Sequence, residues 1–581
     1  MKALVALILL VVVITAAGWY AYQSSPPTPG SPLLSYVPSD TVFFTGYVRP
    51  PTAGKLLIAW RKLRPAYASN LAGLDPKHAT AAGGPAAGVL AGVLRRQAMV
   101  TADAGGWPFA IYGLPRGGVV VAYTVGTVPV VRWQLDHPQA FWNTVDAAEQ
   151  MADVQGQSEF RSALRLRRYA FGTGENRQPL ELIIATGNGF GVATLATTGI
   201  DEKTLDEVLG VTKPANPLDT TELGTLAGAY GLIPGTVGFI DHLRLLAGLS
   251  GTPGNRLGKI VDSIAAWAGA DMLFPSLRTS ECLEEANVIA SIWPRTVTGV
   301  SALDETTDRL SQRLVIEISD EESLARIEHL RGHIPEVVWS LPGIVGIGLG
   351  VEISSLVPVV EGLEWRINRA TFRCAPLSAA QRLLVRAGTA GLDFATAVLK
   401  DTDTRADVKG IAMVLSDVQP MNDPVVPATG DGVLVITAER PEAVWRIVQS
   451  VVGPDMDTVP EMGGDPAVFP QHMTQGRRVR ALLREQQLAV VVGDAELPER
   501  ADGKPEVVLP NGLFALRYQN GGGLRTIVHI MEGLPVSMDR AVQQVVRETA
   551  EALSALSLSL ALSLDVVKTG LVVDVTATPG D

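Results

Sequence analysis

The chain of 581 residues has few of the residues that most often perform chemistry, with two cysteines and seven histidines. The cysteines, Cys282 and Cys374, do not form a C-x-x-C motif, which argues against redox catalysis. Charged residues make up only 19% of the chain, against a typical share of about 25%. The net charge of −12 argues against a nucleic-acid partner, because phosphate binding requires a basic surface.

Familiar catalytic and cofactor motifs are also missing. Gly248–Thr252 lacks the second glycine that a G-x-S-x-G nucleophile turn requires. Gly254–Ile260 is one residue too short between its glycines for a phosphate loop, and Ile260 stands where magnesium needs a Ser or Thr hydroxyl. We therefore predict no catalytic residue, no cofactor-binding residue and no metal ligand in this sequence.

Two histidine arrangements come closest to a chemical site. His329 and His333 have the i, i+4 spacing of a helical metal-ligand pair, but Gly332 weakens a helix and no third ligand motif accompanies them. Asp241 and His242 follow an expected strand and suggest an acid–base pair. The corresponding position in the second half of the chain is not histidine, so a packing or surface role is the preferred interpretation.

A run of apolar residues at the N-terminus predicts a membrane anchor. Residues 3–22 contain no charged side chain and match the length of ~20 residues that crosses a bilayer. Aromatic residues gather at the far end of the run, and Lys2 on the near side favours a cytoplasmic N-terminus. The alternative is a cleaved signal peptide with Ala16–Gly18 as its cleavage site, although such apolar regions usually span about 7–15 residues.

The anchor predicts where the rest of the chain lies. Residues 1–23 are expected to be a transmembrane signal anchor in a bacterial inner membrane, and residues 24–32, with four prolines, an extended spacer. The C-terminal bulk would then lie in the periplasm, where Cys282 and Cys374 are expected to form one structural disulfide. Chain entropy gives such a bond up to about 4.5 kcal/mol. The alternative is two buried free thiols.

The most informative signal is an internal similarity. Pro138 and Pro441 each follow an acid and a base, precede a tryptophan four residues later, and lie 303 residues apart. Pro38 and Pro342 each precede an expected strand and lie 304 residues apart. Two landmarks at nearly the same offset predict that the exported part is a tandem of two homologous copies.

The two halves are assigned to residues 33–335 and 336–581, each with α+β architecture. Hairpins are as frequent as strand–helix alternations, which favours largely antiparallel sheets with helices packed on one face. The arginine-rich stretch at 165–168 is typical of an edge strand kept soluble by charge, rather than of a site for an anionic ligand or lipid head group. Four tryptophans are interpreted as core packing rather than a ligand site: Trp60, Trp142, Trp365 and Trp445.

The opening of the exported part reads Tyr36-Val37-Pro38-Ser39-Asp40-Thr41-Val42-Phe43-Phe44. With the anchor and the spacer before it, this opening resembles bacterial envelope proteins of unknown function. Their exported domain starts with Val/Leu-Pro-Ala-Asp-Thr and an apolar strand, and Ser39 here replaces the alanine. The resemblance implies an envelope location and brings no active-site residues with it.

Together these observations favour a non-enzymatic binding or scaffolding protein of the cell envelope. It would be held in the inner membrane through residues 3–22, and its partner would be an unknown envelope protein or ligand. One alternative is an envelope hydrolase whose His, Ser or carboxylate groups converge from distant segments. The other is a carrier of apolar ligands or lipids.

Overall fold

The chain divides into two compact units, which are described separately. The first unit runs to Glu317 and also contains Arg373–Pro376, and the second contains Ile318–Phe372 and Leu377–Asp581. The computed structural model describes residues 32–47, 73–102, 109–115, 118–172, 180–197, 200–249, 278–304, 309–356, 371–383, 408–419, 429–452, 460–470, 477–496, 508–519 and 558–579, with a few single residues between these ranges.

The expected anchor at residues 3–22, most of the spacer, Trp60 and Trp365 lie outside the described residues. Within the part of the chain that is described, no helix combines the length and the apolar character needed to span a membrane.

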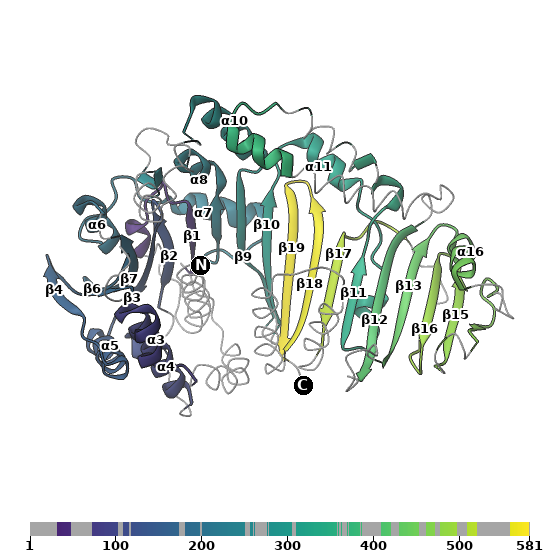
Figure 1. The fold of residues 1–581 in the computed structure, drawn as a ribbon, viewed down its shortest axis with the longest axis horizontal. Helices are drawn as coiled ribbons and strands as arrows, with labels where there is room; N and C mark the ends of the chain where they lie inside the picture. Colours follow the sequence, from purple (N-terminus) through teal and green to yellow (C-terminus); the bar gives the residue numbers. More distant parts are fainter. Residues whose placement is uncertain are drawn as a thin grey trace. The chain divides into compact units, whose positions relative to one another are not determined.

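The first unit alternates hairpins with helices (Figure 1). Its elements are η1 (Pro32–Tyr36), β1 (Phe43–Tyr47), α3 (Pro76–Gly83), α4 (Pro85–Ala102), η2 (Ala110–Tyr112), β2 (Val120–Val125), β3 (Val128–Gln134), α5 (Pro138–Ala152), β4 (Gln157–Arg161), β5 (Leu164–Ala170), β6 (Leu180–Gly187), β7 (Phe190–Thr197), α6 (Glu202–Leu209), α7 (Thr220–Tyr230), β8 (Gly238–Asp241), α8 (His242–Leu249), α10 (Ser280–Ile292), β9 (Arg295–Asp304) and β10 (Arg309–Glu317). Its strands form an antiparallel sheet in the order β10-β9-β8-β1-β2-β3-β7-β6-β5-β4.

The second unit has its own antiparallel sheet. Its elements are α11 (Glu321–Glu328), α12 (Val337–Ser340), β11 (Val345–Leu349), β12 (Val408–Gln419), β13 (Thr429–Ala438), α16 (Pro441–Val452), β14 (Ala467–Val468), β15 (Val479–Arg484), β16 (Gln487–Val492), β17 (Phe514–Tyr518), β18 (Leu558–Val567) and β19 (Gly570–Pro579). The strand order is β19-β18-β17-β11-β12-β13-β16-β15-β14. The predicted α+β class with largely antiparallel sheets is thus confirmed for the described residues.

The strand orders of the two units correspond. With β4 set aside, β1, β2 and β3 of the first unit take the places of β11, β12 and β13 in the second. The strands β7, β6 and β5 correspond to β16, β15 and β14, and β8, β9 and β10 correspond to β17, β18 and β19. On the central strand, Val130 and Val433 occupy equivalent places, each paired with one strand on either side.

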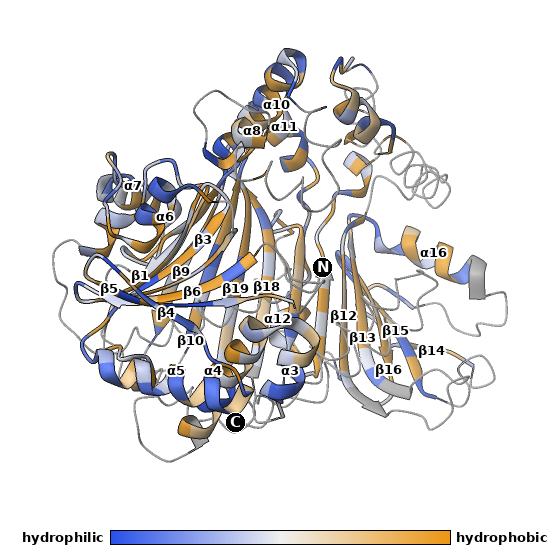
Figure 2. Cartoon of the chain, turned by 60° about the vertical axis from the view of Figure 1, so that its left-hand side comes forward, coloured by the Kyte–Doolittle hydropathy of each residue, from blue (hydrophilic) through white to orange (hydrophobic). Residues whose placement is uncertain are grey.

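Helices cover both faces of each sheet, so the expectation of one covered face is wrong. In the first unit, α6 and α7 pack on one face and α5 on the other, with apolar strands between them (Figure 2). The adjacent residues Val130 and Val131 of β3 belong to opposite apolar clusters. In the second unit, α12 covers one face and α16 the other. The physical reason is that the central strands are apolar at nearly every position, which requires burial on both sides.

Trp142 and Trp445 confirm the predicted core role of the tryptophans that are described. Each is 2% exposed and lies in the helix that follows the central strand of its unit. Trp142 packs edge-on against Phe141, and Trp445 edge-on against Phe469. Trp142 also donates a 2.8 Å hydrogen bond to the hydroxyl of Thr186, whereas the buried Nε1 of Trp445 has no partner among the described residues.

Local sequence chemistry explains the element boundaries. Pro138 and Pro441 begin α5 and α16, because proline fits the first helical turn without losing a hydrogen bond. Asn188 and Gly189 adopt φ values of 52° and 78°, the left-handed pair that closes the β6–β7 hairpin. Gly84, with φ of 84°, separates α3 from α4.

Candidate functional site

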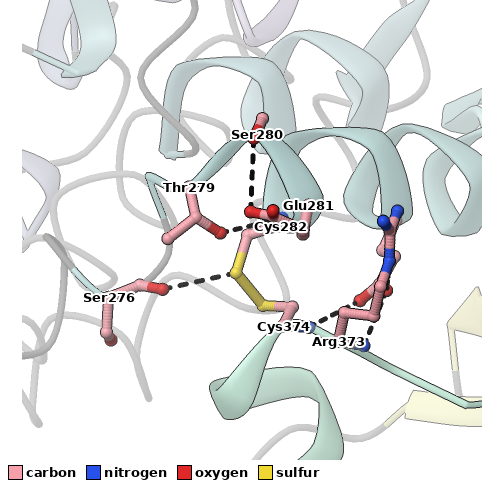
Figure 3. The surroundings of a disulfide bond; sticks show 8 residues. Ser276, Thr279, Ser280, Glu281, Cys282, Arg373 and Cys374 are labelled. Atoms are coloured by element: carbon pink, nitrogen blue, oxygen red, sulfur yellow. Dashed lines mark hydrogen bonds and ion pairs between the residues drawn. A yellow bond between two sulfur atoms is a disulfide. The ribbon is translucent and has the colours of Figure 1, made fainter.

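Cys282 and Cys374 meet in the first unit, where Figure 3 shows them joined. Their sulfur atoms are 2.13 Å apart and both residues are 1% exposed. Cys282 lies in the first turn of α10, which is capped by the Thr279 hydroxyl accepting from the Cys282 amide at 3.2 Å. The described structure thus places the predicted disulfide pair at bonding distance.

The disulfide fixes the segment Arg373–Pro376 against α10. The Glu285 carboxylate accepts from the backbone amides of Arg373 at 2.8 Å and Cys374 at 3.1 Å. The Arg373 guanidinium also pairs with Glu284 at 2.9 Å, on an exposed surface. The Arg373 guanidinium also lies 3.8 Å from the Glu285 carboxylate, so one covalent bond and four polar contacts attach this segment to the helix.

Arg132 on β3 is fully buried and lies among groups that satisfy it. Its guanidinium donates to the carbonyl oxygens of Val208 at 2.9 Å and Leu209 at 3.3 Å, at the C-terminal end of α6. It also donates to the Tyr123 hydroxyl and lies 4.3 Å from the centre of the Phe190 ring. Because a helix C-terminus carries partial negative charge, Arg132 stabilises α6 rather than offering a free cation to a ligand.

A polar cluster, here called the Glu317 cluster, lies where α7, β9 and β10 meet. The Tyr230 hydroxyl donates to the Glu317 carboxylate at 2.5 Å. Arg295 contacts Glu222 at 3.2 Å and Glu317 at 3.8 Å. Burial, and then the neighbouring Glu317 carboxylate, raises the pKa of Tyr230 above its usual value. Every member of the cluster is bonded to another member.

His242 lies close to this cluster but does not form the suggested pair with Asp241. The Asp241 carboxylate accepts from the backbone amide of Arg244 at 2.9 Å and pairs with its guanidinium at 3.3 Å. The His242 ring instead has Nε2 2.9 Å from the Thr296 hydroxyl and packs against Trp293 with the rings tilted by 39° and their centres 4.3 Å apart. Burial lowers the pKa of His242, and the carboxylates of Asp241 and Glu317 oppose that shift.

The arrangement at His242 contains two of the three groups of a nucleophilic site, an imidazole and a hydroxyl. An imidazole nitrogen within hydrogen-bond reach of a hydroxyl is the contact by which a base activates a nucleophile. The third element, a carboxylate that orients the imidazole, is missing from the described contacts because Asp241 is bound to Arg244.

His329 and His333 do not lie on one helix. Helix α11 ends at Glu328, so the i, i+4 spacing does not bring the two rings to one helix face. The buried ring of His333 has Nδ1 2.9 Å from the Leu509 carbonyl oxygen. No group of three or more potential metal ligands occurs within the described ranges.

The arginine-rich stretch at 165–168 is not an edge strand, contrary to the prediction. It lies in β5, which pairs with β4 on one side and β6 on the other. The guanidinium groups of Arg165 and Arg167 lie over the Trp142 ring, 4.3 and 5.1 Å from its centre. Arg167 also pairs with Glu149 at 2.8 Å. Stacking on a buried tryptophan, rather than exposure at an edge, thus accounts for these arginines.

Strand β4 is the open edge of the first unit's sheet within the described ranges. Among the described residues it pairs only with β5, in the register that sets Phe160 opposite Arg165. Phe160 is 80% exposed, more than any other large apolar side chain that the structure describes. On the other face of β4, Glu159 pairs with Arg168 at 2.8 Å, and Arg161 pairs with Asp206 and Glu202 of α6.

Comparison of the chain with protein-family models, with curated proteins and with solved structures finds no match. The candidate sites therefore rest on the chain's own geometry. Sequence reasoning found the cysteine pair but missed the exposed edge at Phe160 and the Glu317 cluster. The polar sequence of Gln157–Arg161, in which Phe160 is the single apolar residue, next to the arginine-rich strand, was the available signal for the edge.

Proposed function

We propose that this chain is a binding protein of the bacterial cell envelope, anchored in the inner membrane through residues 3–22 with its bulk in the periplasm. The apolar N-terminus and the proline-rich spacer support the anchor. The Cys282–Cys374 pair supports the compartment, because disulfides persist in oxidising compartments and are rare in the cytosol.

The observation that carries the binding role is the open edge at β4. An edge strand presents unpaired backbone N–H and C=O groups, and an added strand from a partner can bond to them. Phe160 adds a large exposed apolar side chain to that edge. By contrast, the polar side chains of the Glu317 cluster already bond to one another.

The binding role is tested by placing a photo-crosslinking residue at position 160 of the full chain in growing cells. The same residue at Val288, an exposed apolar position on α10, is the matched control. We expect a discrete crosslinked product from position 160 and none from position 288. Equal products from both positions, or none from position 160, would refute a binding edge at β4.

The location is tested on the same full chain. Protease added to spheroplasts should digest the residues beyond the spacer, and a thiol reagent should label the denatured chain only after reduction. Protection from the protease, or free thiols without reduction, would contradict an exported chain with a disulfide between Cys282 and Cys374.

We also infer that the two units descend from one duplicated domain. The support is the shared strand order together with the offset of 303 residues, which relates Trp142 to Trp445 and Val130 to Val433. An experimental structure in which β13 had neighbours other than β12 and β16 would break the correspondence.

A second candidate function, an envelope hydrolase, is favoured by one contact, the 2.9 Å approach of His242 Nε2 to the Thr296 hydroxyl. Its test is turnover of periplasmic ester, peptide and glycoside substrates by the full chain. A hydrolase using this contact would lose turnover in Thr296→Val and keep part of it in Thr296→Ser. Turnover that survives Thr296→Val would exclude this pair as the site.

A further inference from the structure

Strand β4 carries side chains of opposite charge on either side of its exposed phenylalanine. Its sequence from Gln157 to Arg161 reads Gln-Ser-Glu-Phe-Arg. Glu159 and Arg161 project to one face of the sheet, and Phe160 to the other, because successive side chains of a strand alternate. Opposite charges two residues apart lie opposite each other when the strand pairs antiparallel with a second copy of itself about the residue between them.

Self-pairing of β4 has few possible registers. Two identical strands that continue one sheet in antiparallel fashion are related by a two-fold axis perpendicular to the sheet. Directly opposite residues then share a face, so one residue of the strand must lie opposite its own copy, with the axis midway between the two. The candidates are therefore pairings centred on Gln157, Ser158, Glu159, Phe160 or Arg161. Centring on Gln157 sets every other residue of β4 opposite residues that precede the strand, so it forms no extended pairing.

The charges distinguish these registers. Centring on Glu159 places two carboxylates opposite each other. Centring on Arg161 places two guanidinium groups opposite each other. Both registers are unfavourable because like charges repel. Centring on Ser158 places Phe160 opposite Gly156, which offers it no side chain. Centring on Phe160 places the two phenylalanines together on one face. On the other face it brings each Glu159, which keeps its pair with Arg168, next to the Arg161 of the other copy, which keeps its pairs with α6, so that the existing ion pairs extend across the edge.

We propose that the partner of the open edge is a second copy of this chain, joined by antiparallel pairing of β4 centred on Phe160. This rests on the proposed binding function and names its partner. The pairing is short, since Ser162 has φ of 54° and turns the chain toward β5. Association therefore depends on the concentration of chains, which an anchor in one membrane raises.

Single cysteine substitutions in the full chain, oxidised in native membranes, test the register. In Phe160→Cys the two introduced residues face each other with Cβ atoms about 5 Å apart, close to what a disulfide requires. In the matched control Gln157→Cys the same atoms are about 20 Å apart, from six residues at ~3.3 Å each. We expect about ten-fold more covalent dimer from Phe160→Cys than from Gln157→Cys.

Three outcomes would overturn the inference: no dimer from Phe160→Cys, equal dimer from both variants, or more dimer from Glu159→Cys than from Phe160→Cys. Formation of the native disulfide between Cys282 and Cys374 reports folding of each variant, and Phe160 is too exposed for its loss to disturb the core. Crosslinking of position 160 to a different protein would refute the second copy and leave the binding function intact. A chain that is not exported would fail the protease test instead.

Discussion

The disulfide between Cys282 and Cys374 is expected to decide whether the segment Arg373–Pro376 stays on the first unit. Replacing both cysteines with serine removes a cross-link between positions 92 residues apart, for which chain entropy gives about 4.5 kcal/mol. The two amide hydrogen bonds to Glu285 remain, at about 1.5 kcal/mol each. The exposed Arg373 side chain also pairs with Glu284 at 2.9 Å and with Glu285 at 3.8 Å, which together add about 0–1 kcal/mol.

Ordering the backbone of the four residues in this segment costs about 1–2 kcal/mol for each residue. The remaining contacts, at about 3–4 kcal/mol in total, do not exceed that cost. The segment should therefore leave α10 in the double variant, while the sheet of the first unit stays folded.

Hydrogen exchange of the full chain measures this directly. We expect the amides of residues 373 and 374, which donate to Glu285, to lose protection in the Cys282→Ser, Cys374→Ser double variant, and trypsin to cleave after Arg373. Glu284→Gln, which removes only the exposed ion pair, is the control and should leave both readouts unchanged. Unchanged protection in the double variant would refute the view that the covalent bond holds the segment.

Three further predictions concern buried groups. Arg132→Leu should destabilise the chain by about 3 kcal/mol or more, measured by denaturant unfolding, because two carbonyl groups and a buried hydroxyl lose their donor. Trp142→Phe should cost about 1 kcal/mol more than Trp445→Phe, since only Trp142 donates a hydrogen bond, to Thr186; equal costs would contradict this. Folding lowers the pKa of His242, so as the pH falls the unfolded chain binds a proton at His242 before the folded chain does. The free energy of unfolding should therefore decrease as the pH drops below about 6.5. His242→Gln should flatten this dependence in melting temperatures taken across pH, and an unchanged slope would assign it to other groups.

The parts of the fold that sequence could predict depend on short-range chemistry. The β6–β7 hairpin follows from Asn188-Gly189, because few other residues accept two successive left-handed conformations. The starts of α5 and α16 follow from Pro138 and Pro441. The offset between these prolines placed Trp142 and Trp445 at equivalent positions, and both are buried as expected.

The parts that sequence did not predict depend on long-range pairing. The arginine-rich sequence of β5 is compatible with an edge strand. Only the pairing of β5 with β4 shows that β4, and not β5, lies at the edge of the described sheet. The contact of Arg165 and Arg167 with Trp142 joins a strand to a helix, which strand alternation alone does not encode. The covering of both sheet faces was readable, because strands such as Val120–Val125 lack polar alternation.

The chain segments that connect equivalent strands, β1 to β2 in the first unit and β11 to β12 in the second, contact different elements. In the first unit the chain between β1 and β2 forms α3 and α4, and α4 packs so closely on α5 that a Cβ on Gly92 would lie 2.8 Å from the Ala148 carbonyl oxygen. In the second half the chain between β11 and β12 contains Cys374, which bonds to Cys282 of α10.

Because the chain has only two cysteines, neither has a counterpart at the equivalent place in the other half. If the halves arose by duplication, there are two possible histories. Either both cysteines were gained after the duplication, or each half lost one of the two cysteines that it inherited. A single copy of the repeat holds only one partner of this bond, so the disulfide belongs to the tandem and not to the repeat. If the bond was gained after the duplication, a natural chain with one unit lacks cysteine at both positions. Cysteine at either position of such a chain would show instead that it was lost from one copy.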